Sequence, residues 1–366
     1  MRRAPAPSAA PVPSAQCPSA RGSGLAALLV DHWYRPAPTA LALALWPFAV
    51  LHGLLLRLRR LAYGRGWLQV RAAPVPLVVV GNLVVGGAGK TPTVIALVHA
   101  LQAAGRRPGV VSRGHGRRGT AVAAVAAGDD AADRGDEPLL IARRTGVPVW
   151  VGASRVDAAR ALCAAHPEVD VLVADDGLQH LALAREAEII VFDERGAGNG
   201  LLLPAGPLRE PLPAALPTGC WLLYNAPAPT TALPGTLARR RLAGALPLAQ
   251  WAAGTPFDSG ARQALRALRG RPIVAAAGIA APERFFAMLE AKGLILQRLP
   301  LPDHHHFTTL PWPADTPDVL VTEKDAVKLE AAAVGTTRVW VVGLDFGLAP
   351  ELLGALLPRL DRRDRR

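Results

Sequence analysis

Short apolar runs that end at a glycine or a polar residue recur along the middle of the chain. Three of them cover residues 77–80, 108–112 and 170–174, and each stands directly before a polar loop. Runs of this kind are typical of strands in a parallel sheet that is covered on both faces. Helix-like stretches at 93–102 and 139–144 lie between them. The pattern therefore predicts an α/β fold with a mainly parallel sheet.

The run at 77–80 leads into a loop rich in glycine and then into a helix that opens with Lys90, Thr91 and Pro92. A helix N-terminus behind such a loop is an anion site, because unpaired amides and the helix dipole favour phosphate. In a phosphate-binding loop the lysine reaches the β- and γ-phosphates, and the threonine hydroxyl can ligate Mg²⁺. The residues that would bind the nucleotide are Gly86, Gly87, Ala88, Gly89, Lys90, Thr91 and Pro92.

The general pattern of this loop asks for a glycine where Val84 stands, so an ordinary glycine-rich turn is the alternative. Arginine is the usual cation of the chain, which has four lysines among 41 basic residues. A lysine at the one position where a compact point charge is needed favours the nucleotide-binding loop. We therefore expect a P-loop NTPase-like core.

The apolar run at 170–174 ends at Asp175, Asp176 and Gly177. As a strand of the same sheet, it would bring its carboxyl end to the edge that carries the phosphate loop. A strand that ends in aspartate is the second half of a P-loop site, and its carboxylate holds Mg²⁺ directly or through water. The alternative is a simple Asp-Gly turn. We predict Thr91 and Asp175 as the ligands of the ion.

Acidic and histidine residues form two further groups of candidate site residues. Asp136 and Glu137 precede the helix-like stretch at 139–144, and acidic residues in a first turn favour a helix cap. Asp303 is followed by three adjacent histidines at 304–306. Neighbouring side chains in one strand or loop point in different directions, so a metal site made by all three is not expected. A single histidine that accepts a proton or pairs with a carboxylate is the better interpretation.

The most apolar segment covers residues 38–56, with no charge and one histidine. Its length matches a bilayer core of about 30 Å. Arginines follow at once, which would leave the remainder of the chain in the cytoplasm. Three interpretations stay open: a helix that spans the membrane, a helix that lies in its interface, and a buried helix of a soluble core. We expect membrane attachment.

The formal net charge of +12 predicts acidic partners, such as nucleotide phosphates, a phosphorylated substrate or an anionic membrane surface. Nucleic acid is not expected, because no zinc-finger or aromatic RNA-binding motif is present and aromatic residues make up 5% of the chain. The three cysteines show no paired spacing, so the sequence predicts neither a disulfide framework nor a zinc site.

Changes in composition divide the chain. Residues 1–24 are rich in Ala, Pro, Ser and Arg and predict a disordered tail. Prolines cluster after residue 210, and strand and helix patterns resume at 272–276, which predicts a second, smaller α/β domain. The expected parts are a tail at 1–24, a membrane-associated helical segment at 25–70, a P-loop core at 71–210, a smaller α/β domain at 211–350 and a basic tail at 351–366.

Taken together, these motifs closely resemble the tetraacyldisaccharide 4'-kinase family of lipid A biosynthesis. The resemblance covers about residues 33–342 and departs from the family pattern at His115 and Leu178, where aromatic residues are expected. The motifs that carry it are GN at 81–82, GGAGKTP at 86–92, SRG at 112–114, GDEP at 135–138, DDGLQH at 175–180, GNG at 198–200, PAGPLRE at 204–210, GI at 278–279, PERFF at 282–286, DHH at 303–305 and TEKD at 322–325.

The resemblance implies a membrane-associated kinase that uses ATP and Mg²⁺. Such an enzyme transfers the γ-phosphate to the 4'-hydroxyl of an acylated disaccharide 1-phosphate, at the cytoplasmic face of the bacterial inner membrane. Its partners would be this substrate and the anionic membrane surface, with neither nucleic acid nor an obligate protein partner inferred. The rival function is a membrane-bound P-loop NTPase that acts as a switch on a protein partner.

The resemblance also assigns roles to site residues. Lys90 would act on the phosphates, Asp136 would accept the proton of the sugar hydroxyl, and His304 would assist Asp136. This role replaces the helix cap as the expected function of Asp136, and His305 stays open as the alternative to His304. The further residues expected near the site are Asp176, Glu137 and Arg113.

Overall fold

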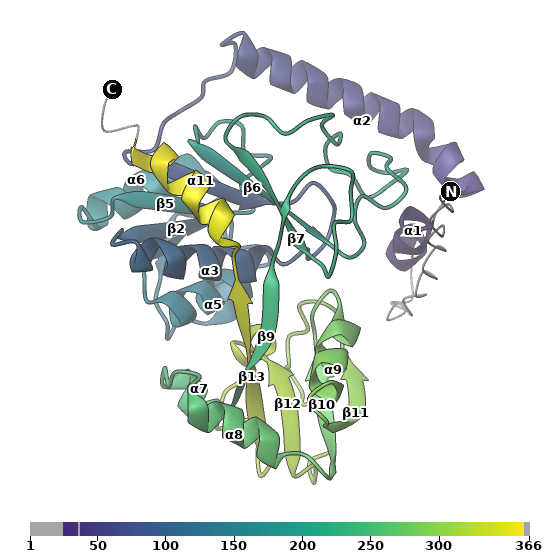
Figure 1. Cartoon of the computed structure of the whole chain (residues 1–366), viewed down its shortest axis with the longest axis vertical. Helices are drawn as coiled ribbons and strands as arrows, with labels where there is room; N and C mark the ends of the chain where they lie inside the picture. Colours follow the sequence, from purple (N-terminus) through teal and green to yellow (C-terminus); the bar gives the residue numbers. More distant parts are fainter. Residues whose placement is uncertain (1–24, 36, 362–366) are drawn as a thin grey trace, which may run out of the picture.

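The structure is a computed structural model that describes residues 25–35 and 37–361 of the 366. Its strands form two sheets, a larger one and a smaller one below it, and the long helix α2 runs across the top (Figure 1). The tail expected at 1–24 lies outside the described residues. We refer to the two parts as the core and the small domain.

The core sheet has eight strands in the order β3-β4-β2-β5-β1-β6-β7-β8, with every neighbouring pair parallel except β3 and β4. The strands predicted at 77–80, 108–112 and 170–174 are confirmed as β1, β2 and β5, and every residue of these strands is buried. The strands are β1 (Leu77–Gly81), β2 (Pro108–Ser112), β3 (Ala123–Val125), β4 (Val149–Val151), β5 (Val171–Asp175), β6 (Ala187–Asp193), β7 (Cys220–Asn225) and β8 (Thr236–Leu237).

Helices and loops cover both faces of this sheet. Successive side chains of a strand point to opposite faces, so alternate residues of β1 belong to different hydrophobic clusters. Val78 and Val80 belong to the hydrophobic cluster that contains α3, α5 and α11. Leu77 and Val79 belong to a second cluster, with α6 and the long loop after β6. The helices of the core are α3 (Lys90–Ala103), α4 (Ala131–Arg134), α5 (Asp136–Thr145), α6 (Arg155–Ala165) and α11 (Pro350–Leu360).

The small domain is built on a five-stranded sheet in the order β11-β10-β12-β13-β9. Its strands are parallel except for β9, which runs antiparallel to β13. This confirms the second α/β unit that the sequence predicts. The elements are β9 (Arg239–Pro247), α7 (Leu248–Ala252), α8 (Ser259–Ala267), β10 (Pro272–Ala277), α9 (Pro282–Glu290), β11 (Ile295–Pro300), β12 (Asp318–Thr322), α10 (Glu323–Ala326) and β13 (Arg338–Gly347).

Two neighbouring strands join the core to the small domain (Figure 1). Ala238 alone separates β8 from β9. β13 pairs antiparallel with β9 from Arg239 to Pro247, with one irregularity between Gly343 and Leu344. The chain then enters α11, which returns to the core, where the Arg359 side chain donates to the carbonyl oxygen of Glu186. The small domain is therefore inserted between the last strand of the core sheet and the last helix that covers it.

The two sheets divide at Ala238, later than the boundary at 211 that the prolines predict. Residues 220–225 form the largely buried strand β7. This strand pairs with β6 and therefore belongs to the core sheet, although prolines surround it in the sequence. The basic tail expected from 351 is a helix as far as Leu360. Its buried leucines recur every fourth residue and pack on the core, which explains the helix.

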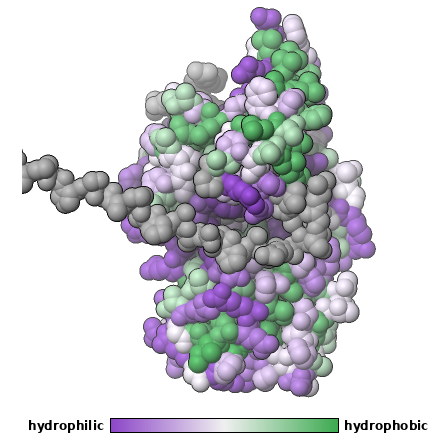
Figure 2. All heavy atoms as spheres, turned by 90° about the vertical axis from the view of Figure 1, so that its right-hand side faces the viewer, coloured by the Kyte–Doolittle hydropathy of each residue, from purple (hydrophilic) through white to green (hydrophobic). Residues whose placement is uncertain are grey.

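Two helices precede the first strand, α1 (Leu25–Trp33) and α2 (Ala40–Gly64). α2 is long and apolar enough to cross a membrane by length and composition. Ala42 and Ala49 are its buried residues, and most of its large apolar side chains are exposed, so α2 is not a buried helix of a soluble core. Figure 2 shows hydrophobic residues gathered at the top of the molecule, where α2 lies in Figure 1. The exposed large apolar residues of α2 are Leu43, Trp46, Phe48, Val50, Leu51, Leu54, Leu55, Leu58 and Leu61.

Candidate active site

The phosphate loop, residues 82–89, connects β1 to α3 and depends on glycine for its shape. Gly89 has a φ of 96°, in the left-handed region, and a Cβ on it would lie 2.2 Å from Nδ2 of Asn225. Asn225 ends β7 and donates from this nitrogen to the carbonyl oxygen of Ala88, at 3.0 Å. α3 begins at Lys90, directly behind the loop. The unpaired amides of its first turn therefore lie at the loop, as an anion site requires.

Lys90 is buried beside this loop and is held by weak contacts. Its Nζ donates to Oδ1 of Asn82 at 3.3 Å and lies 3.8 Å from Oδ2 of Asp176. Asn82 also donates to the carbonyl oxygen of Gly86, at 3.0 Å. Asp176 is bound more closely by Arg209, at 3.1 and 3.3 Å. The charge of Lys90 is thus directed to the loop and remains available to an anion.

Asp175 lies where the sequence predicts, at the carboxyl end of β5 and opposite Val80 of β1 in the sheet register. Its Oδ2 accepts a hydrogen bond from the Ser112 hydroxyl at 3.1 Å, whereas its Oδ1 is buried without a partner. Burial, together with Glu137 and Asp176, raises the pKa of Asp175 to about 7. A buried carboxylate with an unused oxygen is a suitable ligand for a divalent cation, which would offset the cost of its charge.

Asp136 and His304 come from different domains and meet. Asp136 is the first residue of α5 and is 6% exposed, and its Oδ2 lies 2.8 Å from Nδ1 of His304. His304 follows β11 and has a φ of 61°, a backbone conformation that is uncommon without glycine and is concentrated at functional sites. The backbone N–H of His304 donates to the carbonyl oxygen of Gly278 at 3.2 Å, and this hydrogen bond holds the backbone conformation.

This hydrogen bond changes the protonation of both partners. Burial alone would raise the pKa of Asp136, but the hydrogen bond from His304 and the charges of Lys324 and Lys328 bring that pKa below its ordinary value. The same bond raises the pKa of His304. Asp136 is therefore ionised at neutral pH and is able to accept a proton.

Lys324 of α10 contacts His304 and two carboxylates, those of Glu137 and Asp303. Its Nζ lies 3.1 Å from Oε1 of Glu137, 3.3 Å from Oδ1 of Asp303 and 3.3 Å from Nε2 of His304. Burial lowers the pKa of Lys324, but the surrounding carboxylates outweigh burial and raise it, so the ammonium stays charged. We refer to Asp136, Glu137, Asp303, His304 and Lys324 as the Asp136 cluster.

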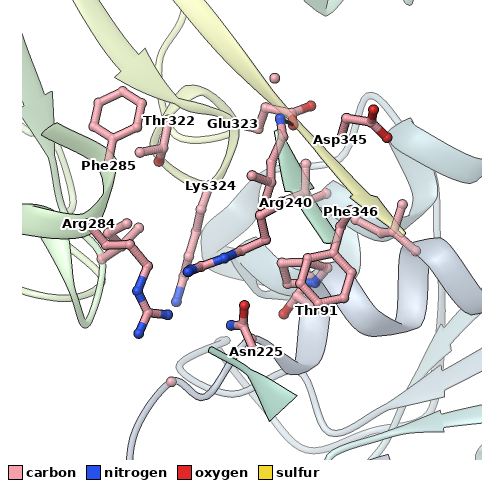
Figure 3. A pocket seen from close by; sticks show the side chains of 18 of the residues that line it. Thr91, Asn225, Arg240, Arg284, Phe285, Thr322, Glu323, Lys324, Asp345 and Phe346 are labelled. Atoms are coloured by element: carbon pink, nitrogen blue, oxygen red, sulfur yellow. Dashed lines mark hydrogen bonds between the residues drawn. The ribbon is translucent and has the colours of Figure 1, made fainter. Parts of the chain in front are cut away.

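A cavity of about 270 Å³ lies between the core and the small domain, beside the phosphate loop. Gly87, Gly89, Lys90, Thr91 and Pro92 line it, and Gly86 and Ala88 do not. In Figure 3 the side chains of Lys324, Arg240 and Arg284 point their nitrogen atoms into the same space, above Asn225. The remaining wall is largely apolar and includes Ile95, Leu140, Leu242, Ile279, Phe285, Met288, Leu344 and Phe346. A cationic mouth and an apolar wall fit a ligand with phosphates and a flat ring.

The structure adds residues to which the sequence assigned no role. Asn225 supports the phosphate loop. Its position could have been recognised in the sequence, because it is a polar residue directly after the apolar run 220–224, and binding sites lie at the carboxyl ends of parallel strands. Arg195 donates to the carbonyl oxygen of Gly87 at 3.0 Å and lies over the ring of Tyr34, next to α1. A lone arginine in a loop gives no signal of this kind. Lys324 belongs to the TEKD motif at 322–325, to which the resemblance assigns no role.

His305, the alternative partner that the sequence left open, does not contact Asp136. His305 packs edge-on against Phe307, and burial lowers its pKa. Within residues 25–35 and 37–361, no group of three or more histidine, cysteine or acidic residues is placed to hold a metal ion. Of the two histidines that the sequence left open, the structure brings His304 to Asp136.

Comparisons with known proteins identify the relatives of the chain. The family model of Tetraacyldisaccharide-1-P 4'-kinase (LpxK) matches residues 41–361. A Tetraacyldisaccharide 4'-kinase of Methylibium petroleiphilum is 54% identical over 345 residues, which cover 92% of this chain and 94% of the relative. A Tetraacyldisaccharide 4'-kinase of Leptothrix cholodnii is 54% identical over 329 residues, which cover 88% and 93%.

A solved structure is similar as well. The crystal structure of the "apo" form of LpxK from Aquifex aeolicus in complex with ATP superposes with a TM-score of 0.70 at 27% sequence identity. The match covers 87% of this chain and 99% of that chain. These matches span both domains, and they favour a phosphotransferase over a P-loop switch.

Proposed function

Because the chain belongs to the Tetraacyldisaccharide-1-P 4'-kinase family, we propose that it transfers the γ-phosphate of ATP to the 4'-hydroxyl of a tetraacyldisaccharide 1-phosphate. The observation that carries the proposal is the 2.8 Å hydrogen bond between Asp136 and His304, beside the phosphate loop and across two domains. A nucleotide switch needs a phosphate loop but has no use for this pair. A kinase needs it to take a proton from its acceptor.

ATP would bind with its phosphates on the phosphate loop and its base in the cavity. The similar structure from Aquifex aeolicus is a complex with ATP, which supports this assignment. The loop amides and Lys90 would neutralise the β- and γ-phosphates, while Arg240 and Arg284 add positive charge at the cavity. Phosphoryl transfer asks a protein mainly for such positioning and charge neutralisation.

Thr91 and Asp175 would hold Mg²⁺. The fit rests on the chemistry of Asp175, a buried carboxylate with one oxygen that has no hydrogen-bond partner. Thr91 follows Lys90 in the first turn of α3 and lines the cavity between the domains. When bound, the ion would offset the charge of the β- and γ-phosphates.

Asp136 would act as the proton acceptor. It takes the proton of the 4'-hydroxyl while that oxygen bonds to the γ-phosphorus and the bond from this phosphorus to ADP breaks. His304 holds the carboxylate in place through its ring N–H. General-base assistance of this kind contributes roughly 10²- to 10⁴-fold to a rate.

The lipid substrate and α2 would meet at the membrane surface. α2 exposes its apolar residues, and Arg57, Arg59 and Arg60 follow them on the same helix. An apolar helix with adjacent arginines binds anionic bilayers through both groups. The proposed location is the cytoplasmic face of the inner membrane. Replacing Leu51 and Leu54, both exposed, with glutamate is expected to abolish sedimentation with anionic vesicles.

A transfer assay tests the function directly. Purified protein in detergent is mixed with γ-labelled ATP, Mg²⁺ and tetraacyldisaccharide 1-phosphate, and the lipid products are separated. We expect label in a bisphosphorylated lipid, and about 10²- to 10³-fold slower labelling with Lys90→Ala. Lys292→Ala is the matched control, because Lys292 is exposed and lies outside the cavity.

Two results would contradict the proposal. Free labelled phosphate without labelled lipid would mean that the protein hydrolyses nucleotide and does not phosphorylate this acceptor. Equal transfer by the Lys90→Ala variant would mean that the phosphate loop is not the site of transfer.

A further inference from the structure

We propose that Arg195 is a positioning residue for the phosphate loop and that the ring of Tyr34 places its guanidinium. The inference rests on the proposed function, because it specifies how the chain prepares the loop for the phosphates of ATP. It is carried by hydrogen bonds to three consecutive carbonyl oxygens of the loop and by the contacts of the guanidinium. The segment before α2 thereby contributes to the affinity for nucleotide.

Three consecutive carbonyl oxygens of the phosphate loop accept hydrogen bonds from side chains. At 3.0 Å each, Nδ2 of Asn82 donates to Gly86, Nη2 of Arg195 to Gly87 and Nδ2 of Asn225 to Ala88. A trans peptide directs its C=O and N–H to opposite sides, so a carbonyl held by a side chain leaves the following amide on the other side. Successive amides on one side of a loop form an anion site. The three side chains therefore orient the loop for phosphate.

Arg195 is the charged member of this set, and it holds the loop from outside. Its side chain is 26% exposed and does not line the cavity between the domains, whereas Gly87 does. A Cβ on Gly86 would lie 3.5 Å from Nη1 of Arg195, so the guanidinium rests directly against the turn of the loop. The arginine thus positions the loop and adds positive charge to it without occupying the place of the phosphates.

Asp193 fixes the edge of the guanidinium. This aspartate ends β6, and it is fully buried. Nε of Arg195 donates to Oδ2 of Asp193 at 3.0 Å, and Nη2 lies 2.9 Å from the same oxygen. Nη2 carries two hydrogens, so it can serve Asp193 and Gly87 at the same time. The guanidinium is therefore held in one orientation by the sheet that carries the loop.

The ring of Tyr34 covers the same guanidinium. Its centre lies 5.2 Å from Cζ of Arg195, within the range of a cation–π contact. The Tyr34 hydroxyl is buried and meets no hydrogen-bond partner in the described part of the chain. Burial raises the pKa of Tyr34, so the side chain is neutral at physiological pH. The contact with Arg195 therefore uses the ring and not the hydroxyl.

Tyr34 directly follows α1, and the end of this helix is fixed to the long loop after β6. The backbone N–H of Asn199 donates to the carbonyl oxygen of Trp33 at 2.8 Å, and Nε1 of Trp33 donates to that of Pro204 at 2.9 Å. A Cβ on Gly198 would lie 2.5 Å from the same Trp33 oxygen, so the two segments approach too closely for a larger residue. These contacts hold Tyr34 over Arg195.

Equilibrium binding of a fluorescent ATP analogue to the full chain tests the inference without any assay of transfer. Tyr34→Leu removes the ring and is expected to weaken binding by about three- to tenfold, because a cation–π contact is lost. Tyr34→Phe keeps the ring and should bind as the wild type does. Equal losses in the two variants, or no loss in either, would overturn the role of the ring.

Tyr63→Leu is the matched control for Tyr34→Leu. The Tyr63 ring lies 5.9 Å from Cζ of Arg59, and both residues belong to α2. This variant also removes a tyrosine ring from an arginine, but the arginine does not hold the phosphate loop. Its affinity for the ATP analogue should equal that of the wild type.

A double variant shows whether Tyr34 acts through Arg195. Arg195→Met should weaken binding by about tenfold or more, because the loop loses a charged hydrogen-bond donor. In this background Tyr34→Leu should cause no further loss, since the ring then has no cation to place. Losses that multiply in the double variant would contradict the inference. If Arg195→Met does not fold, the comparison of Tyr34→Leu with Tyr34→Phe decides by itself.

Kinetics separate positioning from a purely structural role. In Tyr34→Leu the KM for ATP is expected to rise by the same factor as the dissociation constant, with kcat close to that of the wild type. A lower Tm with unchanged nucleotide affinity would mean that the ring only supports the fold. A wild type that binds nucleotide but does not label the lipid would contradict the proposed function instead, and the binding results would still stand.

Discussion

The phosphate loop and the Asp136 cluster both carry charged side chains, but the chain builds them in different ways. The loop is a continuous segment between β1 and α3. Of its supports, Asn225 ends β7 and Asp176 directly follows β5, and both strands belong to the same sheet. The cluster joins Asp136 and His304, which are 168 residues apart and belong to different domains. The loop thus needs one sheet, whereas the cluster needs two folded domains and their packing.

This difference indicates which functions survive when the domains lose their alignment. The phosphate loop keeps its geometry wherever the small domain lies, although the cavity proposed for the base also has walls from the small domain. The proton acceptor keeps its partner only in the arrangement seen here, where α10 packs against α5. Binding of nucleotide and catalysis of transfer are therefore separable by mutation, and the following predictions test that separation.

The largest effect is expected for Asp136→Asn, which keeps the shape of the side chain and removes the base. Turnover should fall by about 10²- to 10⁴-fold, while nucleotide affinity stays close to that of the wild type. Single-turnover transfer of label and equilibrium binding of a fluorescent nucleotide measure the two quantities. Wild-type turnover in this variant would exclude Asp136 as the proton acceptor.

Lys90→Ala removes the cation of the phosphate loop and should impair both nucleotide binding and phosphate transfer. Turnover should fall by about 10²- to 10³-fold, the range found when one charge-stabilising donor is removed. Unlike Asp136→Asn, this variant should also bind nucleotide more weakly, because the loop loses its cation. The same two assays apply. Nucleotide affinity that remains intact after loss of Lys90 would mean that the loop does not hold the phosphates.

Arg144→Met tests the packing on which the cluster depends. Arg144 of α5 donates to Glu323 of α10 at 2.5 Å, and Glu323 is buried between Trp251 and the Leu344 amide. Removal of one partner of a buried pair costs about 3–5 kcal/mol. Denaturant unfolding, followed by tryptophan fluorescence, should show a loss of this size.

The control for this variant is Arg143→Met, one residue earlier. Arg143 lies over the Trp251 ring at 5.2 Å and forms no ion pair with Glu323, so its loss should cost about 1 kcal/mol or less. Equal losses in the two variants would show that the Arg144–Glu323 pair does not join the domains specifically.

The smallest effect concerns pH. The hydrogen bond to Asp136 raises the pKa of His304 in the folded protein, so the charged pair stabilises the fold below the unfolded pKa of about 6.5. This contribution is lost as the pH rises through the folded value. The Tm difference between the wild type and His304→Gln should therefore shrink between pH 6 and pH 9. A difference that grows over this range would contradict the assigned direction.

The sequence alone predicted what depends on local pattern. Strands β1, β2, β5 and β10, the phosphate loop and the second α/β unit follow from apolar runs and glycine positions, and the structure confirms these elements. Asp175 was placed because a strand that ends in aspartate has a known position in a parallel sheet. Each of these inferences needed no contact between distant residues.

What could not be predicted depends on tertiary contacts. From its residues alone Asp136 reads as a helix cap, and the resemblance to a family pointed to another role. The sequence assigned β7 to the smaller domain at 211–350, because its pairing with β6 of the core has no local signal. The contacts of Lys324 with His304 and Glu137 likewise join three separate segments, and no spacing in the sequence predicts them.

The order of the chain has a consequence for biosynthesis. α11 carries Leu352, Leu356 and Leu360 onto the core sheet, yet the whole small domain is translated between β8 and this helix. Domains made at the ribosome usually fold in the order of synthesis. Here the strands of the core sheet are all synthesised by residue 237, but part of one face stays uncovered until α11 is made. The small domain can therefore fold before the core is complete. A truncation before residue 350 would therefore damage the part of the protein that was made earliest.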